Sequence, residues 1–174
     1  MIVPEGGGAT AAADSTDEMR AFEELLVGSA FDALRLARFL GRDPEDAADV
    51  VQEAAILAWR YRHTRRGAWK PWFLAIVRRV AHRSRQTWTL LPWAWRPGPA
   101  SAPELFGQSE VAIALSRLPQ RQRAAVWLRY GQDLTYRDVG RILGVREAAA
   151  KMLVARGRAL LRAHLTSSGE RGGS

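Results

Sequence analysis

Cysteine is absent from the 174 residues of the chain. Its absence excludes disulfide scaffolds, cysteine-ligated zinc and cysteine nucleophiles, and it fits a reducing interior. No apolar run approaches the roughly 18 residues of a membrane helix. The first residues also lack the basic start and apolar stretch of a secretory signal. We therefore expect a cytoplasmic protein without a membrane partner.

Acidic residues are scarce over one long stretch. Between Glu53 and Glu104 the chain holds ten arginines and lysines and no carboxylate, whereas five acids crowd into residues 43–53. The formal net charge is +8 and the pI is near 11. Clustered arginine in a basic chain favours a polyanionic partner, most often nucleic acid, over a merely solvated basic surface. Charge segregated in this way indicates two surfaces with two different partners.

Apolar residues recur with helical spacing, and no alternating strand pattern appears. We expect an all-α fold of two small helical domains joined by a linker rich in proline and tryptophan. The predicted boundaries are a disordered tail at 1–18, a first domain at 19–87, the linker at 88–108, a second domain at 109–165 and a disordered tail at 166–174. In the linker, Trp88, Trp93 and Trp95 either pack on a neighbouring domain or dock into a partner's groove.

The clearest helical pattern follows Asp43. Apolar residues then recur at i, i+3, i+4, i+7, i+10, i+11 and i+14, which is one face of a helix. Asp43 is the predicted N-cap, and Pro44 suits the first turn. Asp46, Asp49 and Glu53 fall on a separate acidic stripe of the same helix.

Residues 60–85 mix nine arginines and lysines with aromatic rings. Basic groups follow a phosphate backbone, and flat rings stack on unpaired bases. Trp72 and Phe73 lie in an apolar helical pattern that predicts a core position. Trp69, beside Lys70, is the better candidate for contact with a base, although a core role stays open for every tryptophan here.

The second domain ends in a short helix, a turn and a longer basic helix. Thr135 and Asp138 form a predicted capping box, Gly144 ends the first of these helices, and the second begins near Arg146. This arrangement favours a helix-turn-helix over an ordinary helical hairpin. The second helix of such a motif can enter the major groove while arginines hold phosphates.

Three stretches follow one another along the chain: "DPEDAADVVQEAAILAWR", "WKPWFLAIVRRV" and "ALSRLPQRQRAAVWLRYGQDLTYRDVGRILGV". Their order and spacing resemble the extracytoplasmic-function group of bacterial RNA polymerase sigma factors. The resemblance covers about residues 20–165. It implies a subunit that directs core polymerase to promoters and assists promoter melting, with no enzyme activity and no cofactor or metal. The implied partners are the clamp coiled coil and flap region of core polymerase, promoter DNA and, as is common in this family, an anti-sigma protein.

The resemblance also assigns roles to three sets of residues. An acidic helix docks on the polymerase clamp, and the clamp set is Asp46, Asp49, Gln52 and Glu53. The following helix recognises and opens the −10 element, and the −10 set is Trp69, Lys70, Trp72, Arg78, Arg79 and Arg83. The helix-turn-helix reads the −35 element, and the −35 set is Arg137, Arg141, Arg146, Lys151 and Arg156.

This sequence departs from the family pattern in two places. The −10 helix commonly carries Asn and Asp where this chain has Arg79 and Arg83, so the family's base preference does not transfer. In the second domain, Met152 and Leu153 stand where family members carry polar reading residues. This predicts weak discrimination among −35 sequences, with affinity supplied by phosphate contacts.

Two other functions fit parts of the sequence. A stand-alone helix-turn-helix regulator would leave the acidic helix and the tryptophan-rich segment without a role. A nuclease could use clustered carboxylates to bind Mg²⁺. The acidic stripe lies on one helix without a second converging element, however, and His63, His82 and His164 lack ligand spacing. The sequence therefore does not predict an enzyme.

Overall fold

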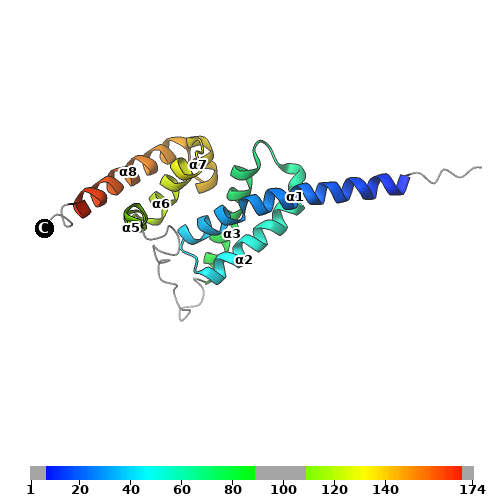
Figure 1. Cartoon of the computed structure of the whole chain (residues 1–174), viewed down its shortest axis with the longest axis horizontal. Coiled ribbons are helices and arrows are strands. Elements are labelled where there is room, and N and C mark those ends of the chain that lie inside the picture. Colours follow the sequence, from blue (N-terminus) through cyan, green and yellow to red (C-terminus); the bar gives the residue numbers. More distant parts are fainter. Residues whose placement is uncertain (1–6, 89–108, 170–174) are drawn as a thin grey trace, which may run out of the picture.

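The computed structural model describes residues 7–88 and 109–169, and the regular structure in these ranges is helical (Figure 1). The first range holds α1 (Gly7–Phe39), α2 (Pro44–Arg60), a 3-10 turn (Arg62–Thr64) and α3 (Trp69–Trp88). The second holds α5 (Glu110–Ser116), α6 (Gln120–Val126), a π-helical turn (Trp127–Gly131), α7 (Tyr136–Leu143) and α8 (Glu147–Gly169). The predicted fold class is confirmed. The predicted linker lies almost wholly outside the described residues, as do Trp93 and Trp95.

Both long terminal helices exceed their predicted lengths. The helix α1 begins at Gly7, within the predicted disordered tail, and its first turns project beyond the other helices (Figure 1). Residues 9–13 are Ala-Thr-Ala-Ala-Ala, and alanine has the highest intrinsic helix propensity. The helix α8 continues to Gly169, past the predicted domain end at 165. Local propensity therefore accounts for the extension of α1, but not for that of α8, whose residues 166–169 are Thr-Ser-Ser-Gly.

In the first domain, α1, α2 and α3 pack around a common apolar centre. The Asp43 carboxylate accepts a hydrogen bond from the backbone N–H of Asp46 at 2.8 Å, and α2 starts at Pro44. The predicted cap is thereby confirmed. Phe22 of α1 contacts Trp59 and Trp69 edge-on, with ring centroids 5.0 and 5.4 Å apart. These ring contacts fix α1 across α2 and α3.

The second domain contains the predicted helix-turn-helix, formed by α7 and α8. Thr135 Oγ1 accepts a hydrogen bond from the backbone N–H of Asp138 at 3.1 Å, which confirms the predicted cap. Gly144 ends α7 in the left-handed conformation, with φ of 65°. A Cβ on Gly140 would lie 2.8 Å from the carbonyl oxygen of Val145. The chain after α7 can therefore pass this close to α7 only because Gly140 has no side chain.

The two domains share one apolar core. Buried residues of α3 and of α6, α7 and α8 belong to a single cluster, and the rings of Phe39 and Trp127 meet across the junction at 5.2 Å. Arg123 of α6 donates a 3.4 Å hydrogen bond from Nη2 to the backbone oxygen of Phe39. This guanidinium is only 2% exposed, and burial lowers its pKa. The domains are thus closed on one another, which the sequence did not predict.

Candidate protein and nucleic-acid interfaces

The clamp set lies along α2 on the side away from the core. The helix buries Ala47, Val50, Ala54 and Ala58, while Asp49 and Gln52 are exposed. Solvent can therefore be replaced by a partner at these two residues without disturbing the domain core.

The other two members of the clamp set already have cationic neighbours within the first domain. Asp46 pairs at 3.6 Å with Arg42, whose side chain is 4% exposed and also donates to the backbone oxygen of Ala81. Glu53 pairs with Arg83 of α3. The structure therefore joins one residue of the clamp set to one of the −10 set, a contact that the sequence did not indicate.

Trp69, which sequence analysis favoured for base contact over Trp72, lies in the core. It is 8% exposed, its Nε1 donates a 2.9 Å hydrogen bond to Ser29 Oγ, and its ring stacks on Phe73 at 5.1 Å. A base could reach it only if α1 moved. The preference for Trp69 thus overlooked the first helix, which covers the start of α3.

Trp72 is the more accessible ring. It is half-buried and lines a groove of about 560 Å³ together with Tyr61, Arg79 and Arg83. The groove therefore presents two flat rings and two guanidinium groups to solvent. Such a combination can hold a stacked base and the phosphate beside it.

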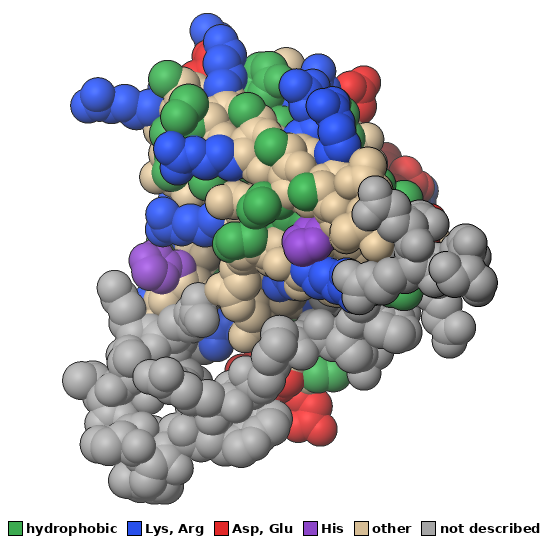
Figure 2. Space-filling model, turned by 90° about the vertical axis from the view of Figure 1, so that its left-hand side faces the viewer, with side chains coloured by type: hydrophobic (Ala, Val, Ile, Leu, Met, Phe, Trp, Pro, Cys, Tyr) green, Lys and Arg blue, Asp and Glu red, His purple; other side chains and the backbone are tan. Residues whose placement is uncertain are grey.

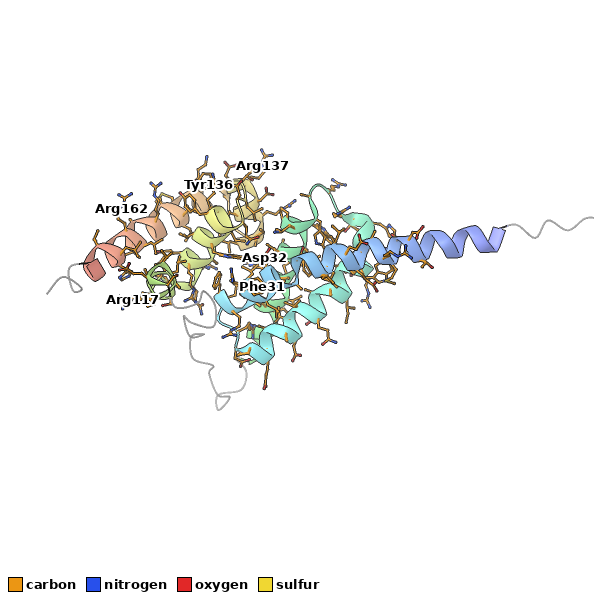
Figure 3. All side chains as sticks on the ribbon, in the orientation of Figure 1. Phe31, Asp32, Arg117, Tyr136, Arg137 and Arg162 are labelled. Atoms are coloured by element: carbon orange, nitrogen blue, oxygen red, sulfur yellow. The ribbon has the colours of Figure 1, made fainter. Side chains whose placement is uncertain are left out.

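Lys70 of the −10 set belongs to a polar bridge between the domains. Its Nζ donates to Asp32 Oδ2 at 2.9 Å and to Gln132 Oε1 at 3.0 Å, and Gln132 Nε2 donates to Asp32 Oδ1 at 2.9 Å. We call these three residues the interdomain bridge. Asp32 lies where α1 passes the second domain (Figure 3). Sequence analysis missed Asp32 and Gln132, because only tertiary packing brings residues 100 positions apart together.

Arg78 of the −10 set faces the helix-turn-helix. Its guanidinium lies against the turn at Gly144, where a Cβ would be 2.6 Å from Nη1. The side chain is half-buried, and burial, Arg121 and Arg79 lower its pKa, in that order of size. In this arrangement Arg78 does not lie on an open DNA-facing surface.

The −35 set is exposed throughout. Arg137 lies at the outer edge of α7, next to Tyr136 (Figure 3). Arg141 pairs with Asp138 at 3.4 Å, and Lys151 pairs with Glu147 at 3.1 Å. Both are i,i+3 or i,i+4 pairs on a helix surface, which are weak and easily exchanged for other contacts. The exposed members of this set are Arg137, Arg141, Arg146, Lys151 and Arg156.

The end of the molecule formed by the second domain is predominantly basic. Figure 2 shows Lys and Arg side chains over the upper and left parts of the described surface, with Asp and Glu near its margins. Met152 of α8 is 53% exposed, whereas Leu153 packs against the core. Of the two apolar residues of α8 that replace polar family residues, Met152 therefore faces solvent and Leu153 does not.

Two features are absent from the described residues. No helix within 7–88 or 109–169 is long and apolar enough to cross a membrane. In the same ranges, no three His, Asp or Glu side chains gather as metal ligands would.

Comparisons with known proteins match each domain separately. Residues 32–89 match the family model "Sigma-70 region 2", and residues 110–161 match "Sigma-70, region 4". The first match contains the clamp set and the −10 set, and the second contains the −35 set. Each predicted site therefore falls inside a matched region.

Two curated proteins are similar along most of this chain. The "ECF RNA polymerase sigma factor SigE" of Mycolicibacterium smegmatis is 31% identical over 175 residues, covering 90% of this chain and 67% of that protein. The "ECF RNA polymerase sigma factor SigM" of Mycobacterium tuberculosis is 34% identical over 165 residues, covering 86% and 80%.

Two solved structures share the fold. The sigma factor RpoE, in complex with the anti-sigma factor NepR from Bartonella quintana, has a TM-score of 0.65 at 24% identity and covers 86% of this chain and 97% of its own. The protein CnrH, in complex with the cytosolic domain of CnrY, has a TM-score of 0.61 at 23% identity and covers 90% and 95%.

Proposed function

Because the chain belongs to the extracytoplasmic-function group of RNA polymerase sigma factors, we propose that its oppositely charged surfaces divide the work of initiation. The acidic stripe of α2 binds the clamp of core polymerase, while α3 and the helix-turn-helix hold the promoter. The observation that carries this proposal is the segregation of charge: Asp49 and Gln52 face solvent on α2, whereas the −35 set consists of exposed cations. A stand-alone regulator is not favoured, since both sigma regions are matched.

For clamp binding, we propose that Asp49 and Gln52 make the first contacts. They are exposed in the closed arrangement, so no internal interaction has to break. Asp46 and Glu53 then exchange their pairing with Arg42 and Arg83 for pairing with basic side chains of the clamp. The Glu53–Arg83 pair is exposed, and a surface ion pair is worth about 0 to 1 kcal/mol, so that exchange costs little. The Asp46 exchange costs more, because it draws a carboxylate away from the buried guanidinium of Arg42.

For the −10 element, the groove beside Trp72 is the proposed place for an unstacked base. Trp72 and Tyr61 provide the rings, and Arg79 and Arg83 can hold the neighbouring phosphates. Opening DNA requires no catalytic residue, because capture of an unstacked base shifts the melting equilibrium. Trp69 supports Trp72 from within the core, with ring centroids 5.6 Å apart.

For full promoter contact, the two domains have to separate. Lys70 is held in the interdomain bridge, and Arg78 lies against the turn of the helix-turn-helix. Arg78 becomes available to DNA only when α3 and α7 part. The same opening frees Lys70 from Gln132 but leaves it paired with Asp32 of its own domain. We propose that binding to core polymerase supplies the free energy for this opening, because a partner that binds only the open state shifts the population toward it.

An anti-sigma protein is the natural opponent of this opening. The two solved structures that share the fold are both complexes, one with an anti-sigma factor and one with the cytosolic domain of CnrY. We propose that an inhibitor of this kind binds the closed arrangement of the present chain and keeps the −10 set covered.

The proposed function is tested by transcription from a fragmented genomic library with purified core polymerase. We expect RNA synthesis to start at defined positions only when the chain is added. The variant Asp49→Lys/Gln52→Lys should bind core polymerase at least about tenfold more weakly, because it places cations against a basic surface. Glu45→Lys, an exposed change outside the clamp set on the same helix, is the matched control. Initiation that is independent of the chain would refute the function, and equal binding by both variants would refute the docking surface.

A further inference from the structure

Cationic side chains from both domains meet in the seam between α3 and α6–α7. On one side of Arg78, a cavity of about 110 Å³ is lined by Arg78 and His82 of α3 and by Arg121 of α6. On its other side, a hollow of about 370 Å³ is lined by Arg78, Arg79 and Arg141. The seam is therefore a place where two positively charged surfaces have been brought together.

Among the described residues, no Asp or Glu lines either cavity. Arg141, at the larger hollow, pairs with Asp138 of its own helix, but Asp138 lines neither cavity. In the part of the chain that the structure describes, Arg78, Arg79 and Arg121 make no ion pair. Elsewhere at the same junction the structure does provide an acid, since Lys70 is paired with Asp32. The seam thus differs from the interdomain bridge in lacking a compensating charge.

The missing charge has an energetic consequence. Arg78 is half-buried, and both its burial and the neighbouring guanidinium groups of Arg121 and Arg79 disfavour its charged form. Charges repel more strongly where water is partly excluded. Arg78 still carries its charge, since an arginine does not deprotonate in a protein. Closing the domains therefore brings like charges together, and an anion in the seam would relieve the repulsion.

We propose that the seam binds a phosphate group, which bridges Arg78 of the first domain and Arg121 of the second. Guanidinium groups present planar, paired donors that match phosphate oxygens. The cavity of about 110 Å³ exceeds the roughly 30 Å³ that one water takes up in the liquid, so it can admit a small oxyanion. This site does not depend on the proposed function.

Phosphate binding and domain closure are linked in this site. Arg78 and His82 come from α3 and Arg121 from α6, so a bridged anion exists only in the closed arrangement. An anion that binds one arrangement shifts the population toward it, and closure in turn strengthens anion binding by the same factor. The phosphate can come from a free anion or from the backbone of a nucleic-acid strand.

The binding test is a calorimetric titration of the full chain at fixed ionic strength. One arm uses inorganic pyrophosphate, and the other uses a short abasic deoxyribose-phosphate oligomer. The variant Arg78→Ala/Arg121→Ala should bind at least about tenfold more weakly, since it loses two charge-assisted contacts. Arg117→Ala/Arg162→Ala has the same net charge, changes exposed residues away from the seam, and should bind as the parent does (Figure 3).

Closure is measured by energy transfer between dyes on the two domains. Because the chain has no cysteine, Glu24→Cys and Ala155→Cys give two unique labelling positions, both exposed. Pyrophosphate should raise the transfer efficiency of the parent and leave that of the Arg78→Ala/Arg121→Ala variant unchanged. In phosphate-free buffer, Arg121→Glu should raise the transfer efficiency without any anion, because the new carboxylate can itself pair with Arg78.

Each outcome decides the proposal. If pyrophosphate binding depends on the two arginines, the seam takes a free anion. If only oligomer binding depends on them, the phosphate belongs to a nucleic-acid strand. The proposal is overturned if neither probe depends on Arg78 and Arg121, or if both double variants lose binding equally. If the Arg78→Ala/Arg121→Ala variant fails to fold, the transfer efficiency of Arg121→Glu decides instead. An unchanged transfer efficiency in Arg121→Glu also overturns the proposal.

Discussion

The two regions of this sigma factor that we propose to face DNA carry the same sign of charge but differ in availability. In the second domain, the −35 set is exposed, and its ion pairs lie within single helices. In the first domain, Trp69 is buried, Lys70 is held in the interdomain bridge, and Arg78 faces the turn at Gly144. In the proposed function, the second domain can therefore meet DNA as it stands, and the first domain has to be released beforehand.

The difference shows that net charge alone does not define a binding surface. Both regions satisfy the same compositional criterion of clustered arginine. In the first domain, however, neighbouring helices already use the cationic groups, and Arg83 is paired with Glu53 of the clamp set. In the proposed function, polymerase docking and −10 contact are therefore coupled through the Glu53–Arg83 pair, whereas the pairs of the −35 set lie within single helices.

The largest expected effect separates the two tryptophans of α3. Trp69→Ala should destabilise the protein by about 3 to 5 kcal/mol, because it empties a core position and leaves Ser29 without its donor. Trp72→Ala, at a half-buried position, should cost clearly less stability but weaken binding to single-stranded −10 DNA. Urea unfolding and binding titrations measure the two quantities. Equal stability losses would contradict the assignment of Trp69 to the core and Trp72 to the groove.

A smaller effect is expected at the interdomain bridge. Asp32→Ala removes the acceptor of Lys70 and Gln132, and should weaken closure by about 1 to 2 kcal/mol. The released Lys70 should then improve binding of −10 DNA. Glu23→Ala, an exposed change on the same helix that leaves the labelling position free, serves as the control. The distance between the domains, measured by energy transfer, should increase only for Asp32→Ala, and an unchanged distance would remove the bridge from the account of closure.

A still smaller effect is expected in the second domain, whose −35 set is exposed. Arg137→Ala should reduce the slope of log affinity against log salt by about one, because one phosphate contact is lost. The loss should be similar for all −35 sequences, since phosphate contacts carry no base information. Arg117→Ala, at an exposed position of the same domain, should leave the slope unchanged. A loss confined to one −35 sequence would show instead that Arg137 reads a base.

The sequence predicted what depends on local pattern. Helical spacing and the caps at Asp43 and Thr135 predicted the start of α2 and the helix-turn-helix, and both caps are present. The exposed acids of α2 followed from the same spacing. The closed arrangement of the domains was not predictable, because it depends on contacts such as Asp32 with Gln132 and Phe39 with Trp127, far apart in the chain. The burial of Trp69 was missed for the same reason, since α1 covers it.

The smallest effect is expected at a partly exposed pair outside the −10 and −35 sets, where Arg62 Nε donates to Glu18 Oε1 at 2.8 Å. The hydrogen bond from Arg62 holds the pKa of Glu18 below its usual value of 4.5. Since the folded-state pKa is lowered, the contribution to stability is present above the unfolded-state pKa and is lost as pH falls through the folded one. Glu18→Gln should therefore slightly weaken docking of α1 around residue 18 at neutral pH and leave it unchanged below the folded-state pKa. The measurement is the overall helicity by circular dichroism between pH 6 and 3, with the exposed Glu23→Gln as control. A difference between the two variants that persists at pH 3 would show that the charge of Glu18 is not what holds this end of α1.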